Sequence, residues 1–251
     1  MLSEHTHEEL IAGLDHVAAD LLRQADVRRP PVDAIAMARA LGITLAWDDR
    51  QQGRARYVRL HGRAMGRPIA TILLRPDPRR ERQQWAVAHE IGEHAAHCVF
   101  DYWGDDPRVA PPNAREQVAN QLAGRLLLPT DWFAADGSAC AWDLIALKAR
   151  YTTASHELIA RRMLDCCPPV IISIFDQRRL SFRRGNVEGR VPPPLPSEMA
   201  CWRRVHEECR PRRAWQGPGV VQGWPVHEGG WKREILRMEL SSMDEEPIMC
   251  R

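Results

Sequence analysis

The chain of 251 residues is long enough for one large or two small domains with a substantial apolar core. With 44% hydrophobic and 27% charged residues and a net charge of +2, the composition is that of a globular protein and calls for no nucleic-acid partner by itself. No apolar run approaches the about 20 residues of a membrane span, and the acidic N-terminus does not resemble a secretory signal. The seven cysteines include no C-x-x-C pair, which favours reduced thiols and a cytoplasmic protein without a membrane partner.

The N-terminal third predicts two helices and then three strands. A helix over 6–24 begins with Thr6 and Glu9 in the pattern of a capping box. A second helix is expected over 30–41, with proline in its first turn and Gly42 at its end. Strands are then expected over 43–47, 55–60 and 69–74, the last two joined as a hairpin through 61–68.

The remaining chain predicts mainly helices before residue 168 and mainly strands after it. Helices are expected over 80–98, 114–128, 141–151 and 155–164. A hairpin is expected over 170–184, followed by a stiff proline-rich linker at 191–196. Beyond it we expect a helix over 197–209 and strands over 220–226 and 231–240.

The stretch WAVAHEIGEHAAHCVF carries the chemistry of the chain. His89 and Glu93 are four residues apart, so a helix places both on one face. A catalytic zinc ion needs three protein ligands and an open fourth position, and imidazole nitrogens and carboxylate oxygens both serve. Glu90 follows the first ligand and is placed to act as general base, while Glu116 on the next predicted helix can supply the third ligand.

His94 is the alternative second ligand. An offset of five residues turns its side chain about 140° beyond one full turn, so a regular helix would aim it away from the metal of His89. A one-residue bulge, easiest at Gly92, would bring it back. We prefer Glu93, because His97 keeps the register of His89 without an insertion. A second carboxylate would shift activity toward higher pH. It would also allow the site to bind Mn²⁺ as an alternative to Zn²⁺.

Two blocks of sequence resemble the ImmA/IrrE family of zinc metallopeptidases. The first block contains His89, Glu90, Gly92 and His97, and the second contains Glu116, Ala119, Asn120, Ala123 and the sequence LLLP. The resemblance covers about residues 30 to 165 and makes His89 and Glu116 ligands and Glu90 the base. At the position of the second ligand this chain has Glu93, where the family has histidine.

The resemblance implies an α+β fold with a zincin-like helical protease core and a small antiparallel sheet, here followed by a small C-terminal α/β extension. It also implies an intracellular stress response in which a zinc endopeptidase cleaves a protein substrate such as a transcriptional repressor. We expect a metallopeptidase-like domain over 1–168, ending in two helices with helix-turn-helix spacing. Residues 169–251 would hold a β-hairpin, the linker and a C-terminal subdomain, with no role assigned to 192–251.

A catalytically silent regulator is the alternative function. It would keep the fold and bind DNA or a repressor through the helical segment and the basic tail. Between 170 and 215, arginines exceed acidic residues by five. No aromatic-rich nucleic-acid motif accompanies them, so a solvated surface explains this charge better than a nucleic-acid site.

Overall fold

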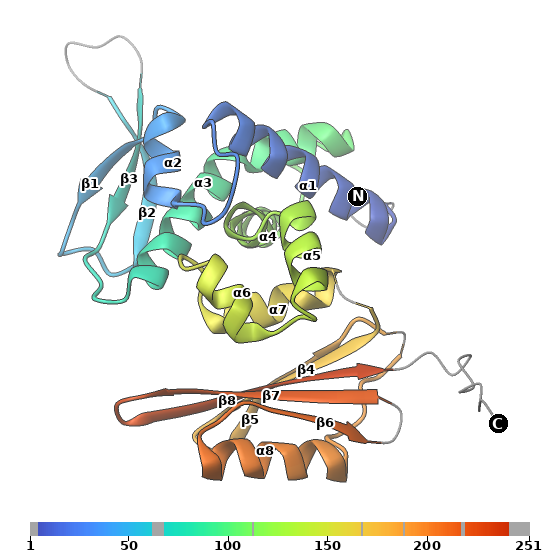
Figure 1. Ribbon diagram of the computed structural model, residues 1–251. Coiled ribbons are helices and arrows are strands. Elements are labelled where there is room, and N and C mark those ends of the chain that lie inside the picture. The colour runs from blue at the N-terminus through green and yellow to red at the C-terminus, as the bar shows by residue number, and fades with distance from the viewer. Residues whose placement is uncertain are drawn as a thin grey trace. The chain divides into compact units, whose positions relative to one another are not determined.

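The computed structural model describes residues 5–61, 68–111, 113–166, 168–187, 189–216 and 219–240. Over this part of the chain it has the predicted α+β fold, with two separate sheets (Figure 1). The helices are α1 (His7–Gln24), α2 (Ala34–Ala40), α3 (Arg80–Trp103), α4 (Ala114–Leu127), α5 (Thr130–Ala139), α6 (Leu144–Arg150), α7 (His156–Cys166) and α8 (Pro196–Glu208). The strands are β1 (Thr44–Trp47), β2 (Ala55–Leu60), β3 (Ile69–Leu74), β4 (Val170–Asp176), β5 (Arg179–Gly185), β6 (Arg212–Gln216), β7 (Gly219–Glu228) and β8 (Trp231–Leu240).

The chain divides into two compact units, each of which has more contacts between Cα atoms within itself than with the other. The first comprises Met1–Asp136 and Lys148–Ser155, and the second comprises Gly137–Leu147 and His156–Arg251. Dense contacts do not by themselves say which segments fold independently. The domain boundary expected after residue 168 therefore stays a prediction.

The two N-terminal helices begin at side-chain caps. Thr6 accepts a hydrogen bond from the backbone of Glu9, whose side chain accepts one from the backbone of Thr6, so the predicted capping box is confirmed. Asp33 caps α2 by accepting from the backbone N–H groups of Ile35 and Ala36. The prediction of proline in the first turn was wrong. The helix begins only after Asp33, whose carboxylate caps the free N–H groups, so Pro30 and Pro31 lie before it.

Helices α3 and α4 form the centre of the first unit, and α1 packs against both. The middle of α3 is buried on the face formed by Val87, Ile91, Ala95 and Val99. The helix continues past the predicted end at 98 and stops at Gly104, whose positive φ of 74° ends it in the left-handed conformation. Helix α5 was not predicted, because its sequence, TDWFAADGSA, lacks a regular apolar spacing.

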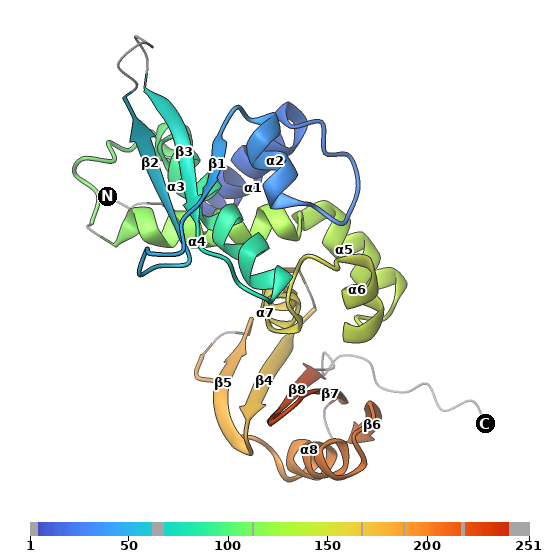
Figure 2. The ribbon, with the colours of Figure 1, turned by 90° about the vertical axis from the view of Figure 1, so that its left-hand side faces the viewer.

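A three-stranded sheet lies beside α3, with strand order β1-β3-β2 (Figure 2). The predicted hairpin of β2 and β3 is antiparallel, with Tyr57 opposite Ile72. Its connection at 62–67 lies outside the described residues. β1 pairs with β3 in parallel, so this small sheet is mixed and β2 forms one of its edges.

The second unit contains a five-stranded antiparallel sheet of order β5-β4-β8-β7-β6. Helix α8 packs on one face of it (Figure 1). The core under α8 consists of Ile171, Phe175, Cys201, Trp202, Val205, Val221, Leu236 and Met238. The predicted hairpin of β4 and β5 is present, and its two turn residues, Gln177 and Arg178, have positive φ as a two-residue turn requires. β6 was not predicted.

The cap of α2 provides a test of local stability. Burial opposes ionisation of Asp33, but hydrogen bonds from Gln84, Ala36 and Ile35 outweigh it and lower the pKa of this carboxyl. Because the folded-state pKa is lowered, the stabilisation is present above the unfolded value of 3.8 and is lost as pH falls through the folded value. Asp33→Ala should cost about 1 kcal/mol at neutral pH.

The measurement is urea unfolding between pH 3 and pH 7. Asp33→Asn is the control, since asparagine also caps helices and should cost less. The difference between parent and Asp33→Ala should shrink as the solution is made acidic. A difference that does not change with pH would show that the charge of Asp33 contributes nothing.

Candidate metal centre

The crossing of α3 and α4 depends on Gly92. A Cβ at this position would lie 2.6 Å from the carbonyl oxygen of Ala119 and 3.0 Å from its Cα. Any larger residue would therefore push the two helices apart. α3 is continuous through this point, so Gly92 permits close approach of the two backbones and does not produce a bulge.

The close crossing brings three predicted ligands together. His89, Glu93 and Glu116 offer ligand atoms that all lie within 4.8 Å of one another. His89 Nε2 is 3.5 Å from a carboxylate oxygen of Glu116, across the two helices. His89 and Glu93 are partly buried and Glu116 is exposed, so the group opens to solvent on one side.

Asn120 connects two of these side chains. Its Oδ1 is 3.2 Å from Nδ1 of His89, and its amide donates to Glu116 over 3.1 Å. An acceptor at Nδ1 requires that nitrogen to carry the proton, which leaves Nε2 of His89 as a lone-pair donor. Outer partners of this kind orient metal ligands. The sequence placed Asn120 in a family block but assigned it no role; its i+4 spacing from Glu116 was the available signal.

Arg115 is a second neighbour that the sequence did not indicate. Its Nε donates to a carboxylate oxygen of Glu93 over 2.7 Å, and its Nη2 donates to the backbone carbonyl of Glu93 over 2.8 Å. The guanidinium offsets part of the negative charge that two carboxylates bring to this group. It also holds Glu93 in place beside His89.

Glu90 is buried against the sheet next to the ligand group. Its Oε2 accepts a hydrogen bond of 2.6 Å from the backbone N–H of Tyr57 on β2. Burial raises the pKa of Glu90, and the charges of Glu93 and Glu116 raise it further, against the hydrogen bond from Tyr57 and the charge of His89. A carboxyl of this kind ionises less readily than an ordinary glutamate and holds a proton more firmly.

His94 lies outside the group of three. Its Nδ1 is 2.9 Å from the hydroxyl of Tyr57, and the two rings are in contact. Burial lowers the pKa of His94, and the positive charges of His97 and Arg59 lower it further. His97 is exposed and its Nδ1 is 3.0 Å from the carbonyl of His94. The regular helix therefore favours Glu93 over His94 as second ligand.

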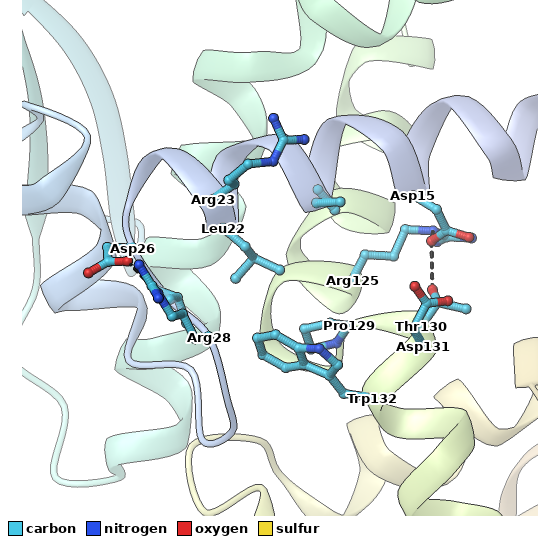
Figure 3. A pocket seen from close by; sticks show the side chains of 13 residues that line it. Asp15, Leu22, Arg23, Asp26, Arg28, Arg125, Pro129, Thr130, Asp131 and Trp132 are labelled. Atoms are coloured by element: carbon cyan, nitrogen blue, oxygen red, sulfur yellow. Dashed lines mark hydrogen bonds and ion pairs between the residues drawn. The ribbon is translucent and has the colours of Figure 1, made fainter.

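A pocket of about 370 Å³ lies elsewhere in the first unit (Figure 3). Asp15 lines it and accepts hydrogen bonds from Arg125 Nε over 2.8 Å and from the Thr130 hydroxyl over 2.6 Å. Leu22 and Trp132 contribute apolar surface. None of the five predicted site residues lines this pocket, and its ion pair joins α1 to the end of α4.

The fold and the histidine–glutamate helix define the class of this protein as one related to metallopeptidases. The chain belongs to the family of IrrE N-terminal-like domains, Peptidase_M78, which matches residues 38–164, about half of its length. This confirms the resemblance found in the sequence. Among the helices that the structure describes, none has the length and apolar character needed to cross a membrane.

A Mycobacterium tuberculosis transcriptional regulator has a similar structure, with a TM-score of 0.64 and 17% sequence identity. The match covers 94% of this chain and 77% of the mycobacterial chain. At this identity the similarity is one of fold. Comparison with curated proteins gave no match.

The two rival ligands can be separated by alanine variants. Loss of an outer partner lowers metal affinity by about 10- to 100-fold, and loss of a ligand should lower it by more. Glu93→Ala should therefore weaken Zn²⁺ binding by more than this factor. His94→Ala should change it little, because His94 contacts Tyr57 and not the ligand group. Calorimetric titration with Zn²⁺ measures both. The reverse order of effects would show that a bulged α3 binds the metal through His94.

Asn120 provides a test of the outer partner. Asn120→Ala removes the acceptor that fixes the tautomer of His89, so Zn²⁺ affinity should fall about 10- to 100-fold with stability nearly unchanged. Gln117→Ala, an exposed position on the same helix, is the matched control. Equal affinities for the two variants would remove Asn120 from the site.

Proposed function

We propose that the chain is a metal-dependent endopeptidase in which His89, Glu93 and Glu116 hold a divalent ion and Glu90 is the general base. One observation carries the proposal: three ligand atoms from two crossing helices lie within 4.8 Å of one another, directly beside a buried glutamate. Membership of a metallopeptidase family supports it.

The chemistry of the donor set fits zinc. One imidazole nitrogen and two carboxylate oxygens are ligands that zinc accepts, and three protein ligands leave a position open. Two carboxylates also suit Mn²⁺. Asn120 orients both His89 and Glu116, as outer partners do in metal sites.

The ion, when bound, would supply Lewis-acid chemistry that polarises the scissile carbonyl and lowers the pKa of water. Glu90 would accept a proton from the attacking water and deliver it to the leaving amide nitrogen. Its raised pKa suits both tasks, because a carboxylate that binds a proton more firmly than an ordinary glutamate is a stronger acceptor for the proton of water and can still pass it on to the leaving nitrogen. The N–H of Tyr57 would keep one oxygen of Glu90 oriented throughout.

The edge strand β2 supports a peptide as substrate. Tyr57 donates its N–H to Glu90 and not to β3, so the outer edge of β2 faces the candidate site. On a strand, Ala55 and Arg59 present backbone groups to the same edge as Tyr57. An extended peptide could pair with these groups and place its carbonyl next to Glu90.

The proposed substrate is a regulatory protein, such as a transcriptional repressor, within the cytoplasm. The mycobacterial structure with the same fold is named a transcriptional regulator, which supports a role in regulation. A direct nucleic-acid contact has less support. Arg183, one of the arginines of the basic stretch, forms a two-pronged ion pair with the buried Glu198 and is thereby committed to the fold.

A catalytically silent regulator is the second candidate function. The ion pair between Arg115 and Glu93 supports it, since the guanidinium already neutralises this carboxylate without a metal and engages one of its two oxygens. Such a protein would use the same surface to bind a repressor without cleaving it. Metal content and cleavage distinguish the two functions.

The general base can be tested with Glu90→Gln. This variant should keep about one ion per chain at the His89 site, because Glu90 is not a ligand, and should lose cleavage by a factor of about 10² to 10⁴ or more. Glutamine can still accept the N–H of Tyr57, so the fold should be retained. The assay is elemental analysis together with mass spectrometry of a mixture of extended synthetic peptides.

The controls for this experiment are Gln117→Ala and the metal-free parent. The first should cleave like the parent, and the second should be inactive until zinc is returned. Cleavage by Glu90→Gln at the parental rate would disprove the role of Glu90. A parent that holds no ion at the His89 site and cleaves nothing would favour the silent regulator.

A further inference from the structure

A second cluster of metal-ligand side chains lies beyond the residues that match the family. His206 on α8, His227 on β7 and Glu234 on β8 offer ligand atoms that all lie within 4.8 Å of one another. All three residues belong to the second unit. They come from three different elements, so no spacing in the sequence connects them.

The packing of α8 on the sheet brings them together. Trp202 and His206 are four residues apart on α8, and Trp202 belongs to the core under this helix. On β8, Glu234 alternates onto the same sheet face as the core residue Leu236. β7 places His227 on this face as well, since it pairs with Lys232, two residues before Glu234.

The two imidazoles meet at a single oxygen. Nδ1 of His206 lies 2.9 Å from Oε1 of Glu234, and Nε2 of His227 lies 2.7 Å from the same atom. The other oxygen of Glu234, Oε2, accepts the indole N–H of Trp202 over 3.1 Å. Trp202 and His206 are stacked, with ring centroids 5.6 Å apart. The carboxylate and the histidine of α8 are therefore held in fixed positions.

The charges explain why this geometry suits a cation. The side chain of Glu234 is completely buried, and those of His206 and His227 are only 16% and 18% exposed. One imidazolium would neutralise the single carboxylate, yet two imidazoles are directed at one oxygen. A divalent ion in place of the two N–H protons would bind both nitrogens and Oε1 at once, and its charge would offset that of the buried carboxylate.

We propose that His206, His227 and Glu234 form a second zinc site, independent of the proposed peptidase site. Two imidazole nitrogens and one carboxylate oxygen are ligands typical of zinc, and the partial exposure of both histidines gives the ion a route from solvent. The Trp202 N–H would orient the carboxylate as an outer partner. Bound zinc would tie α8 to the β7–β8 hairpin and stabilise the second unit.

The experiment compares four versions of the full chain: the parent, His89→Ala, the double variant His206→Asn with His227→Gln, and the combination of all three changes. Asparagine places an amide N–H near Nδ1 of His206, and glutamine places one near Nε2 of His227. Both can still donate to Glu234 while giving up the imidazole ligands. Each metal-free protein is titrated with ZnCl₂, and bound zinc and melting temperature are measured.

The parent should bind about two ions, the double variant and His89→Ala about one each, and the combination none. Zinc should raise the melting temperature of the parent by more than that of the double variant. If the double variant binds zinc and gains stability like the parent, the second site does not exist. If His89→Ala alone leaves the zinc content unchanged, the peptidase proposal fails while the second site stands.

A double variant that does not fold is covered by a measurement on the parent. Zinc should shift the ¹⁵N resonances of Nδ1 of His206 and Nε2 of His227, since these atoms would become ligands. The single variant His227→Gln supplies the assignment. If neither nitrogen responds to zinc at a concentration that saturates the chain, the three side chains form only a hydrogen-bonded network.

Discussion

The close crossing of α3 and α4 at Gly92 and Ala119 is the constraint on which the candidate centre depends. Without a Cβ at Gly92, the backbone of α4 comes near enough for Glu116 to lie beside His89 and Glu93. A side chain there would separate the helices and the ligands with them. The same helix crossing therefore packs the apolar core and brings the candidate ligands together.

Electrostatic arrangement around this crossing decides what the three ligands can do. Arg115 offsets the additional negative charge that Glu93 brings in place of a histidine, and Asn120 fixes the protonated nitrogen of His89. Glu90 is turned the other way, toward β2, where burial raises its pKa. On α3, the proposed ligands His89 and Glu93 therefore lie toward α4, while the proposed base Glu90 contacts β2.

The second unit also places histidines around a carboxyl group, but here that group, of Glu234, is completely buried. Its sheet buries the carboxyl group of Glu234 under α8, and the fold places two histidines and an indole N–H around it. A buried carboxylate needs such partners whether or not an ion is present. In the same unit, the pair of Arg183 and Glu198 satisfies this need with a guanidinium alone, which contrasts with the two imidazoles at Glu234.

From the sequence alone, most helices and strands could be predicted, and so could the placement of His89, Glu90 and Glu93 on one helix. Capping residues, apolar spacing and the His89–Glu90–Glu93 pattern are local, and local rules of helix geometry interpret them. The sequence did not indicate α5 or β6, whose residues lack a clear period, and it placed the start of α2 too early. The folded chain was needed to show that Gly92 lies at a helix crossing, that Arg115 pairs with Glu93, and that His206 lies beside His227 and Glu234. These are contacts between different elements, and their geometry depends on how helices and strands pack, which no spacing along one segment encodes.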